Sequence, residues 1–255
     1  MQINQLAVAL RPRNAHEAID LGFMLARAYW KSLYMIWFTL LLPLVILLQF
    51  LEAYNAWIVA VIIWWFKPLY DRVALFVYGR QVFGETPTVR DAWRAIPGFF
   101  RTGLIAALTY RRIDLARSFN LPIFQLEGLR GATRRARQKI LNKNTRPKAV
   151  WLAIACIHFE SILAFSLIAI VYLMAPHTVQ QQVGEMLLDN NAPLWVGLLT
   201  NMLYFMAISI VEPFYVAAGF ALYLNRRTQI EGWDIELVFH DIAGNIRSSE
   251  ASEAA

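Results

Sequence analysis

Three ionisable residues stand within or at the edge of long apolar stretches of this 255-residue sequence: Lys67, Glu160 and Glu212. A charged side chain inside a membrane-spanning helix is costly, and it usually pairs with another charge or lines a cavity. The chemistry available to such residues is ion binding, proton transfer or a buried ion pair. These three are therefore the candidate intramembrane charges.

Lys67 and Glu212 share a local pattern, because each directly precedes a proline, Pro68 and Pro213. A proline inside a helix removes a backbone hydrogen bond, so both are candidate helix breaks. The two charges are opposite, and we predict that they face each other. Two alternatives stay open: the Lys67 ammonium extends to the inner membrane surface, or it pairs with Asp71 one turn along the helix.

Glu160 follows Lys148 by twelve residues, which is roughly 18 Å along a helix and near the middle of a bilayer. It is a candidate proton or ion site, or a carboxyl group that hydrogen-bonds between helices. His158 is two residues away and points to another face of the helix. The two residues therefore do not form a metal site or an acid–base pair by themselves.

The elements that must position these charges are apolar. Hydrophobic residues make up 58% of the chain and charged residues only 16%, against about 25% charged in soluble domains. Three blocks, 33–66, 150–175 and 192–224, each exceed the roughly 20 apolar residues that cross a bilayer. The polar turn at 52–55 divides the first block. The sequence thus predicts an all-α polytopic membrane protein with four transmembrane helices.

The basic residues predict the orientation of these helices. Of 24 Lys and Arg residues, four precede residue 33, 17 lie between Lys67 and Lys148, and three follow residue 225. None falls in 52–55 or 176–191, so the positive-inside rule places both termini in the cytoplasm. The predicted organisation is a cytoplasmic amphipathic helix (1–32), a transmembrane hairpin (33–80), a basic cytoplasmic or interfacial connector (81–149), a second hairpin (150–225) and a cytoplasmic tail (226–255).

The two hairpins resemble each other. Lys67-Pro68-Leu69-Tyr70 matches Glu212-Pro213-Phe214-Tyr215, and a second tyrosine follows each proline by ten residues. The match predicts a parallel repeat, with an axis along the membrane normal. Chance is the alternative, since proline and tyrosine are common near interfaces. The block 192–224 would be about 50 Å long as a helix, which predicts a bend at Pro213.

The connector is strongly basic, with twelve basic and two acidic residues between 101 and 148. We expect 98–110 to be interfacial or re-entrant, 119–126 to be an extended link, and 126–141 to be a helix. Its basic face comprises Arg130, Arg134, Arg135, Arg137, Lys139 and Lys143. Such a face attracts anionic phospholipid headgroups at about 1 kcal/mol per charge. An acidic partner protein is the alternative. We do not expect a nucleic acid as a partner, because the positive-inside topology already explains the positive charge of the connector.

Residues that would define an enzyme are missing. The sequence has no nucleophile elbow, zinc-protease, P-loop or dinucleotide motif, and its four histidines are scattered. The single cysteine, Cys156, rules out an internal disulfide. We therefore expect no cofactor and no catalytic residue set.

At the N-terminus, Asn14 and Glu17 fit a helix-capping pair.

Short motifs near both ends resemble a known group. Arg11-Pro12-Arg13 with 17–23, and 221–236 with Leu222-Tyr223-Leu224, look like uncharacterised bacterial multi-pass proteins similar to the glycerophosphodiester phosphodiesterase membrane-domain group. The motifs cover about a fifth of the chain, which has no hydrolase module. The resemblance implies an all-helical fold in a bacterial inner membrane and no activity.

These features favour a non-enzymatic subunit or scaffold of an inner-membrane assembly. It would contact the bilayer, anionic headgroups and other membrane proteins or copies of itself. The first alternative is a small homo-oligomeric transporter or channel that uses the broken helices and the intramembrane charges. The second is a lipid-handling enzyme. Transport predicts a polar cavity that reaches Glu160, whereas a scaffold predicts a dry helix interface.

Overall fold

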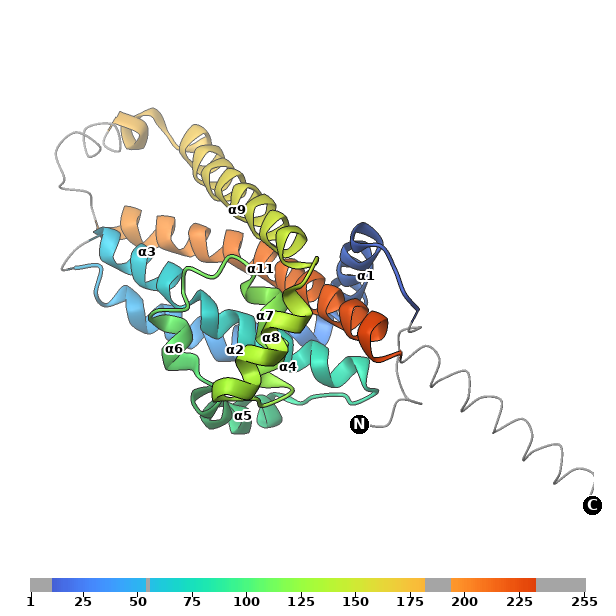
Figure 1. The fold of residues 1–255 in the computed structure, drawn as a ribbon. Helices are drawn as coiled ribbons and strands as arrows, with labels where there is room; N and C mark the ends of the chain where they lie inside the picture. Colours follow the sequence, from blue (N-terminus) through green and yellow to red (C-terminus); the bar gives the residue numbers. More distant parts are fainter. Residues whose placement is uncertain (1–10, 54–55, 182–193, 233–255) are drawn as a thin grey trace, which may run out of the picture.

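The computed structural model describes residues 11–53, 56–181 and 194–232, and the regular elements in these ranges are helices (Figure 1). Three of these helices are long and apolar enough to cross a membrane: α2 (Trp30–Gln49), α9 (Arg146–Met174) and α11 (Leu194–Glu231). The chain is therefore an all-helical protein with three candidate membrane spans. Most of the segment 176–191, which lacks Lys and Arg, and most of the predicted cytoplasmic tail lie outside the described residues.

The second half of the first predicted hairpin is divided into two helices, α3 (Ala56–Trp65) and α4 (Lys67–Val82). Pro68 lies in the first turn of α4, where its missing N–H breaks no helical bond. Helix α3 is only about 15 Å long, and α4 is buried along almost its whole length. The break thus separates the more exposed helix α3 from the residues after Phe66, which enter the protein core.

Pro213 does not end a helix, because α11 continues through it from residue 194 to residue 231. The proline leaves the carbonyl group of Ser209 without its usual helical donor. The Tyr34 hydroxyl of α2 donates to this carbonyl at 3.0 Å, and the Trp37 indole donates to the Ser209 hydroxyl at 3.0 Å. Neighbouring side chains therefore support α11 at the predicted break.

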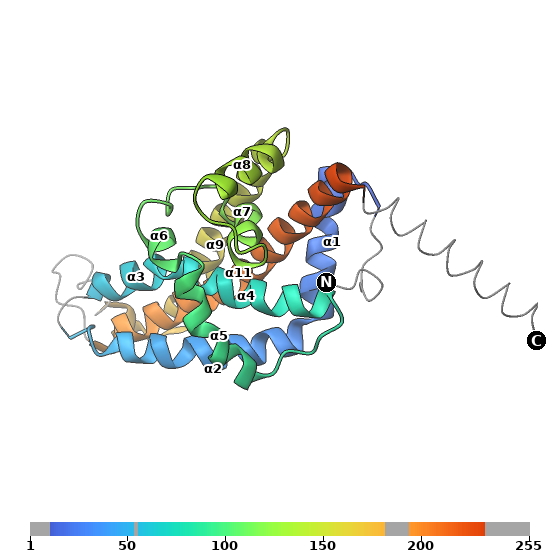
Figure 2. The same ribbon diagram turned by 60° about the horizontal axis from the view of Figure 1, so that its bottom comes forward.

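The N-terminal helix α1 (Ala15–Ala28) begins at the predicted cap, where the Asn14 side chain accepts a hydrogen bond from the Glu17 amide. It packs along the C-terminal half of α11 (Figures 1 and 2). Gly22 makes this contact close, since a Cβ atom there would lie 2.6 Å from the Ala218 nitrogen. The C-terminal half of α11 is buried by such neighbours.

The connector folds into four helices: α5 (Val89–Arg101), α6 (Leu104–Leu108), α7 (Arg117–Gln125) and α8 (Gly131–Asn142). The predicted extended link at 119–126 is wrong, because α7 is helical and its residues 118–123 are buried. Helix α7 packs against α4 and α11, and this burial outweighs the preference of Pro122 for a helix end. The helix predicted at 126–141 is found at 131–142.

The contact between α1 and α11 makes a testable prediction. Gly22→Ala forces a methyl group into the Ala218 backbone, and we expect it to lower the free energy of unfolding by about 1–3 kcal/mol. Gly98→Ala is the matched control, because a Cβ atom there meets nothing within 4 Å. Thermal unfolding in mild detergent measures both, and equal midpoints would contradict the close packing.

Candidate functional site

Five buried side chains form one continuous series of ion pairs, called here the charge chain: Glu160, Lys67, Glu212, Arg117 and Asp71. The Lys67 ammonium lies 2.5 Å from Glu160 Oε2 and 2.9 Å from Glu212 Oε2. Arg117 Nη2 lies 2.8 Å from Glu212 Oε1, and Arg117 Nε binds Asp71 Oδ2. Opposite charges alternate along the series, and the four residues other than Arg117 are at most 6% exposed.

Four helices converge to supply the charge chain (Figure 1). Lys67 and Asp71 stand one turn apart at the start of α4, Glu160 lies within α9, and Glu212 lies within α11. Arg117 is the first residue of α7. Because α4 begins at Lys67, the break at Phe66 fixes where this ammonium enters the core. The charge chain therefore ties both predicted hairpins to the connector.

The structure brings the three predicted intramembrane charges into direct contact. The Lys67 ammonium contacts Glu160 and Glu212 together, while Asp71, the alternative partner of Lys67, binds Arg117. Arg117 is the member that the sequence analysis missed, because it was counted among the connector cations. The signal that marks it is the apolar run of α7, which directly follows it and enters the core.

A cavity of about 270 Å³ adjoins the charge chain. Its charged lining includes Lys67, Arg117, Glu160 and Glu212, and Cys156 lies at its wall. The Arg112 guanidinium also lines it and stacks 3.7 Å from the centre of the Trp64 ring. The predicted charges thus border a space large enough for several water molecules.

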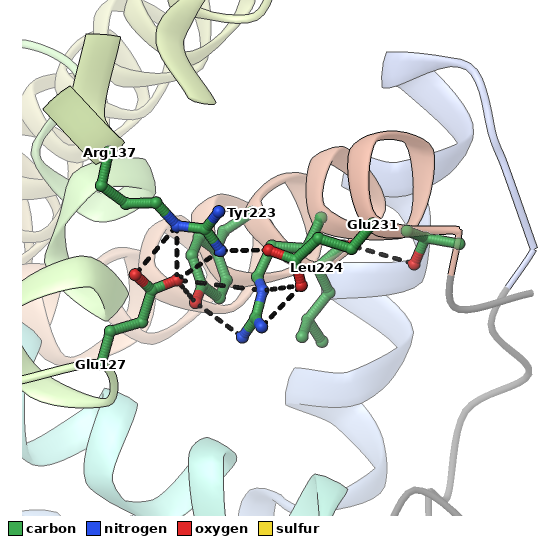
Figure 3. A network of polar contacts seen from close by, with 7 residues as sticks. Glu127, Arg137, Tyr223, Leu224 and Glu231 are labelled. Carbon is green, nitrogen blue, oxygen red and sulfur yellow. Dashed lines mark hydrogen bonds and ion pairs between the residues drawn. The ribbon is translucent and has the colours of Figure 1, made fainter. Parts of the chain in front are cut away.

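A second polar network joins α8 to the end of α11 (Figure 3). Arg137 binds Glu127 at 3.0 Å and also binds Glu231, and the Tyr223 hydroxyl donates to Glu127 Oε1 at 2.6 Å. The hydrogen bonds that the Arg137 guanidinium donates to Glu127, and then to Glu231, raise the pKa of Arg137 above its ordinary value. Arg137 is therefore a structural cation that points inward, and it does not belong to an outward basic face.

The other residues of the predicted basic face fall into two groups, those that bind other parts of the protein and those on an open surface. The Arg130 guanidinium donates to the Arg101 carbonyl at 2.7 Å, and the Arg134 guanidinium lies 5.2 Å from the centre of the Phe124 ring. Three cations remain on an open surface with Arg146: Arg135, Lys139 and Lys143. They line a concavity of about 600 Å³, called here the basic basin.

Within the described ranges, no group of three His, Cys, Asp or Glu residues is arranged to hold a metal ion. The three carboxylates of the charge chain are instead bridged by Lys67 and Arg117. The chain matches no protein-family model, and neither a curated protein nor a solved structure matches it.

Removing one cation from the charge chain should be strongly destabilising. Lys67→Met leaves Glu160 without its cation and Glu212 with one cation fewer, and breaking a buried pair in this way costs about 3–5 kcal/mol. Lys143→Met, at an exposed lysine, should change the free energy of unfolding by less than about 1 kcal/mol. Unfolding in detergent measures both variants.

The geometry of the ion pairs also predicts which second substitution restores stability to the Lys67→Met variant. Lys67→Met combined with Glu160→Gln should recover part of the lost stability, because it removes the carboxylate that the first change leaves without a partner. Reversing both Lys67 and Glu212 should not recover it, since the new side chains would face Glu160 and Arg117 with like charges. Full recovery by the double reversal would contradict the connected series of ion pairs.

Proposed function

We propose that this protein is a non-enzymatic integral subunit or scaffold of a bacterial inner-membrane assembly, with both termini in the cytoplasm. The observation that carries the proposal is the division of its charges. The ionised groups of the core pair with one another in the charge chain. The cations of the basic basin are exposed, and among the described residues no carboxylate lies at ion-pair distance from them, although Asp114 is part of the basin lining. The positive charge of the basic basin is therefore available to bind another molecule.

The position of the basic basin supports anionic lipid as one of its partners. Arg135, Lys139 and Lys143 are carried by α8 or lie just after it, and Arg146 is the first residue of the candidate span α9. Basic residues next to the cytoplasmic end of a span lie at the level of the phospholipid headgroups. The basin would thus hold the cytoplasmic helices against the inner leaflet.

The outer half of α9 supports a role in assembly with other membrane proteins or a second copy. Phe165, Leu173 and Met174 are each more than 70% exposed, and the last buried residue of α9 in the structure is Ala164. Most of the surface of a span in this position contacts lipid unless another helix packs on it. The proposed assembly supplies that helix.

The four-span arrangement with a parallel repeat belongs to the same proposal. Helix α3 enters the bilayer from the outer side, and the first turns of α4 complete the crossing. Each copy of the repeat then contributes one charge before a proline, and these two charges, Lys67 and Glu212, meet at 2.9 Å. Their meeting at equivalent positions supports an axis between the hairpins.

Neutralising the basic basin tests the proposal. We expect the triple variant Arg135→Gln, Lys139→Gln, Lys143→Gln to retain several-fold less anionic phospholipid after purification in mild detergent, and to co-purify with less partner protein. The matched control neutralises three exposed arginines of α5: Arg90, Arg94 and Arg101. Mass spectrometry identifies the lipids and proteins, and equal retention by both variants would overturn the role of the basin.

The cavity beside Glu160 favours a second candidate, a small homo-oligomeric transporter or channel. A polar space that reaches an intramembrane charge is what transport predicts, and Lys67, Glu160 and Glu212 all line this one. Purified protein in liposomes should then support ion flux, and Glu160→Gln should reduce that flux at least tenfold. Liposomes that contain the Lys143→Met variant are the control for this flux measurement. Absence of flux in the unmodified protein excludes this candidate.

A further inference from the structure

We propose that two copies of this chain pack against each other through α9, in parallel about a two-fold axis along the membrane normal, with their His158 side chains at that axis. The inference rests on the proposed assembly role, for which it names the partner and the contact surface. The observation that carries it is a polar side chain on the outward face of a candidate span.

His158 points away from the rest of the protein near the middle of α9. It follows Lys148 by ten residues, which is about 15 Å along a helix and close to the centre of the hydrocarbon layer. It is exposed and stands about 200° around the helix from the buried Glu160. Helix α9 packs chiefly on α11 and lies at the edge of the bundle (Figure 1). An ionisable residue at this depth almost always faces other helices or a water-filled cavity, so the face that carries His158 belongs to an interface.

The His158 ring needs a hydrogen-bond donor from another molecule. Its Nδ1 atom donates to the Ile154 carbonyl at 2.8 Å, because a carbonyl group only accepts. The neutral ring then has an acceptor lone pair on Nε2, and none of the described residues donates a hydrogen bond to it. An acceptor without a donor is costly in hydrocarbon. Direct exposure of this face to lipid is therefore unfavourable.

A second copy satisfies this acceptor by symmetry. Two copies inserted in the same direction are related by an axis along the membrane normal, so each residue on the contact face meets its equivalent at the same depth. The two His158 Nε2 atoms then face each other. One water molecule on the axis has two O–H donors, one for each ring. An unrelated helix would need a donor at the same depth, whereas a second copy always has a matching group there.

The residues around His158 have the spacing of a helix pair. They are all exposed, are separated alternately by four and three residues, and are called here the α9 strip: Trp151, Ala155, His158, Ile162, Phe165 and Ala169. Such a strip packs against its equivalent on another helix at a crossing angle of about 20°. Ala155 and Ala169 lie on either side of His158 and are small, which lets the two backbones approach closely.

The α9 strip is also large enough for a specific contact. Trp151 is 70% exposed and Phe165 is 74% exposed, and an aromatic side chain buries about 150–250 Å². The strips of two copies therefore supply on the order of 1,000 Å², the size that a specific interface requires. Packing and polar contacts, rather than the exclusion of water, hold helices together in lipid. His158 should therefore decide the strength of the pair.

Cysteine cross-linking in native membranes tests this contact. Cys156 is the single cysteine of the sequence, so Cys156→Ala provides a background to which one cysteine at a time is added. Ala155→Cys and Ile162→Cys should form disulfide-linked dimers under mild oxidation, because the contact brings equivalent residues within reach of a disulfide. Ile157→Cys is the matched control. It is also exposed but lies about 100° around the helix from His158, and it should give several-fold fewer dimers.

Substitutions of His158 test its role separately. His158→Leu replaces an exposed polar side chain of a span with an apolar one, so the variant should insert and fold. We expect its dimer fraction in mild detergent to fall several-fold, measured by size-exclusion chromatography with light scattering. His158→Gln keeps a polar group and should retain most of the dimer. A His158→Leu protein that dimerises as fully as the unmodified one would show that His158 does not hold the pair.

The outcome also separates this inference from the proposed function. If Ala155→Cys and Ile162→Cys form no dimers, or if Ile157→Cys forms as many, the contact between two copies is wrong. The scaffold role stands in that case provided that other membrane proteins still co-purify with the unmodified chain. If neither dimers nor co-purifying proteins are found, both proposals are wrong.

Discussion

The pairing of opposite charges among the five members of the charge chain is the interaction on which the rest of the structure depends. A charge in a medium of low dielectric is tolerated only when an opposite charge lies in contact with it. Each inner member of the charge chain satisfies two neighbours: Lys67 contacts two glutamates, and Arg117 contacts Glu212 and Asp71. Loss of one member therefore leaves its neighbours without an ion-pair partner. The charge chain thus holds α4, α7, α9 and α11 in a single arrangement.

The two prolines serve this arrangement in different ways. Pro68 stands where α3 has already ended, so the chain changes direction there and presents Lys67 at the start of a new helix. Pro213 stands inside an intact helix, and its cost is offset by the Tyr34 hydroxyl that bonds the freed Ser209 carbonyl. Both positions lie next to a member of the charge chain, which places the irregular backbone where side chains can satisfy it.

The connector contributes to the core as well as to the surface. Arg117 and Arg137 point inward and are fixed by carboxylates from other parts of the chain, whereas Arg135 and Lys139 line the basic basin. Positive charge therefore has two places in this protein: some cations pair with buried acids, and others lie on the exposed surface that we propose binds anionic partners. The exposed cations of the basic basin, such as Arg135 and Lys139, are free of carboxylate partners among the described residues and can bind another molecule.

The sequence by itself determined the properties that depend on residues close together in the chain. Apolar blocks predicted the all-helical class and the candidate spans, Asn14 predicted the cap of α1, and the rarity of charge inside apolar segments marked Lys67, Glu160 and Glu212. The tertiary structure alone decided which groups meet. Lys67 and Glu160 are 93 residues apart, and Arg117 is 95 residues from Glu212; such pairings are set by helix packing, which local periodicity does not encode. For the same reason α7 is a buried helix despite Pro122, because α4 and α11 pack against its apolar residues.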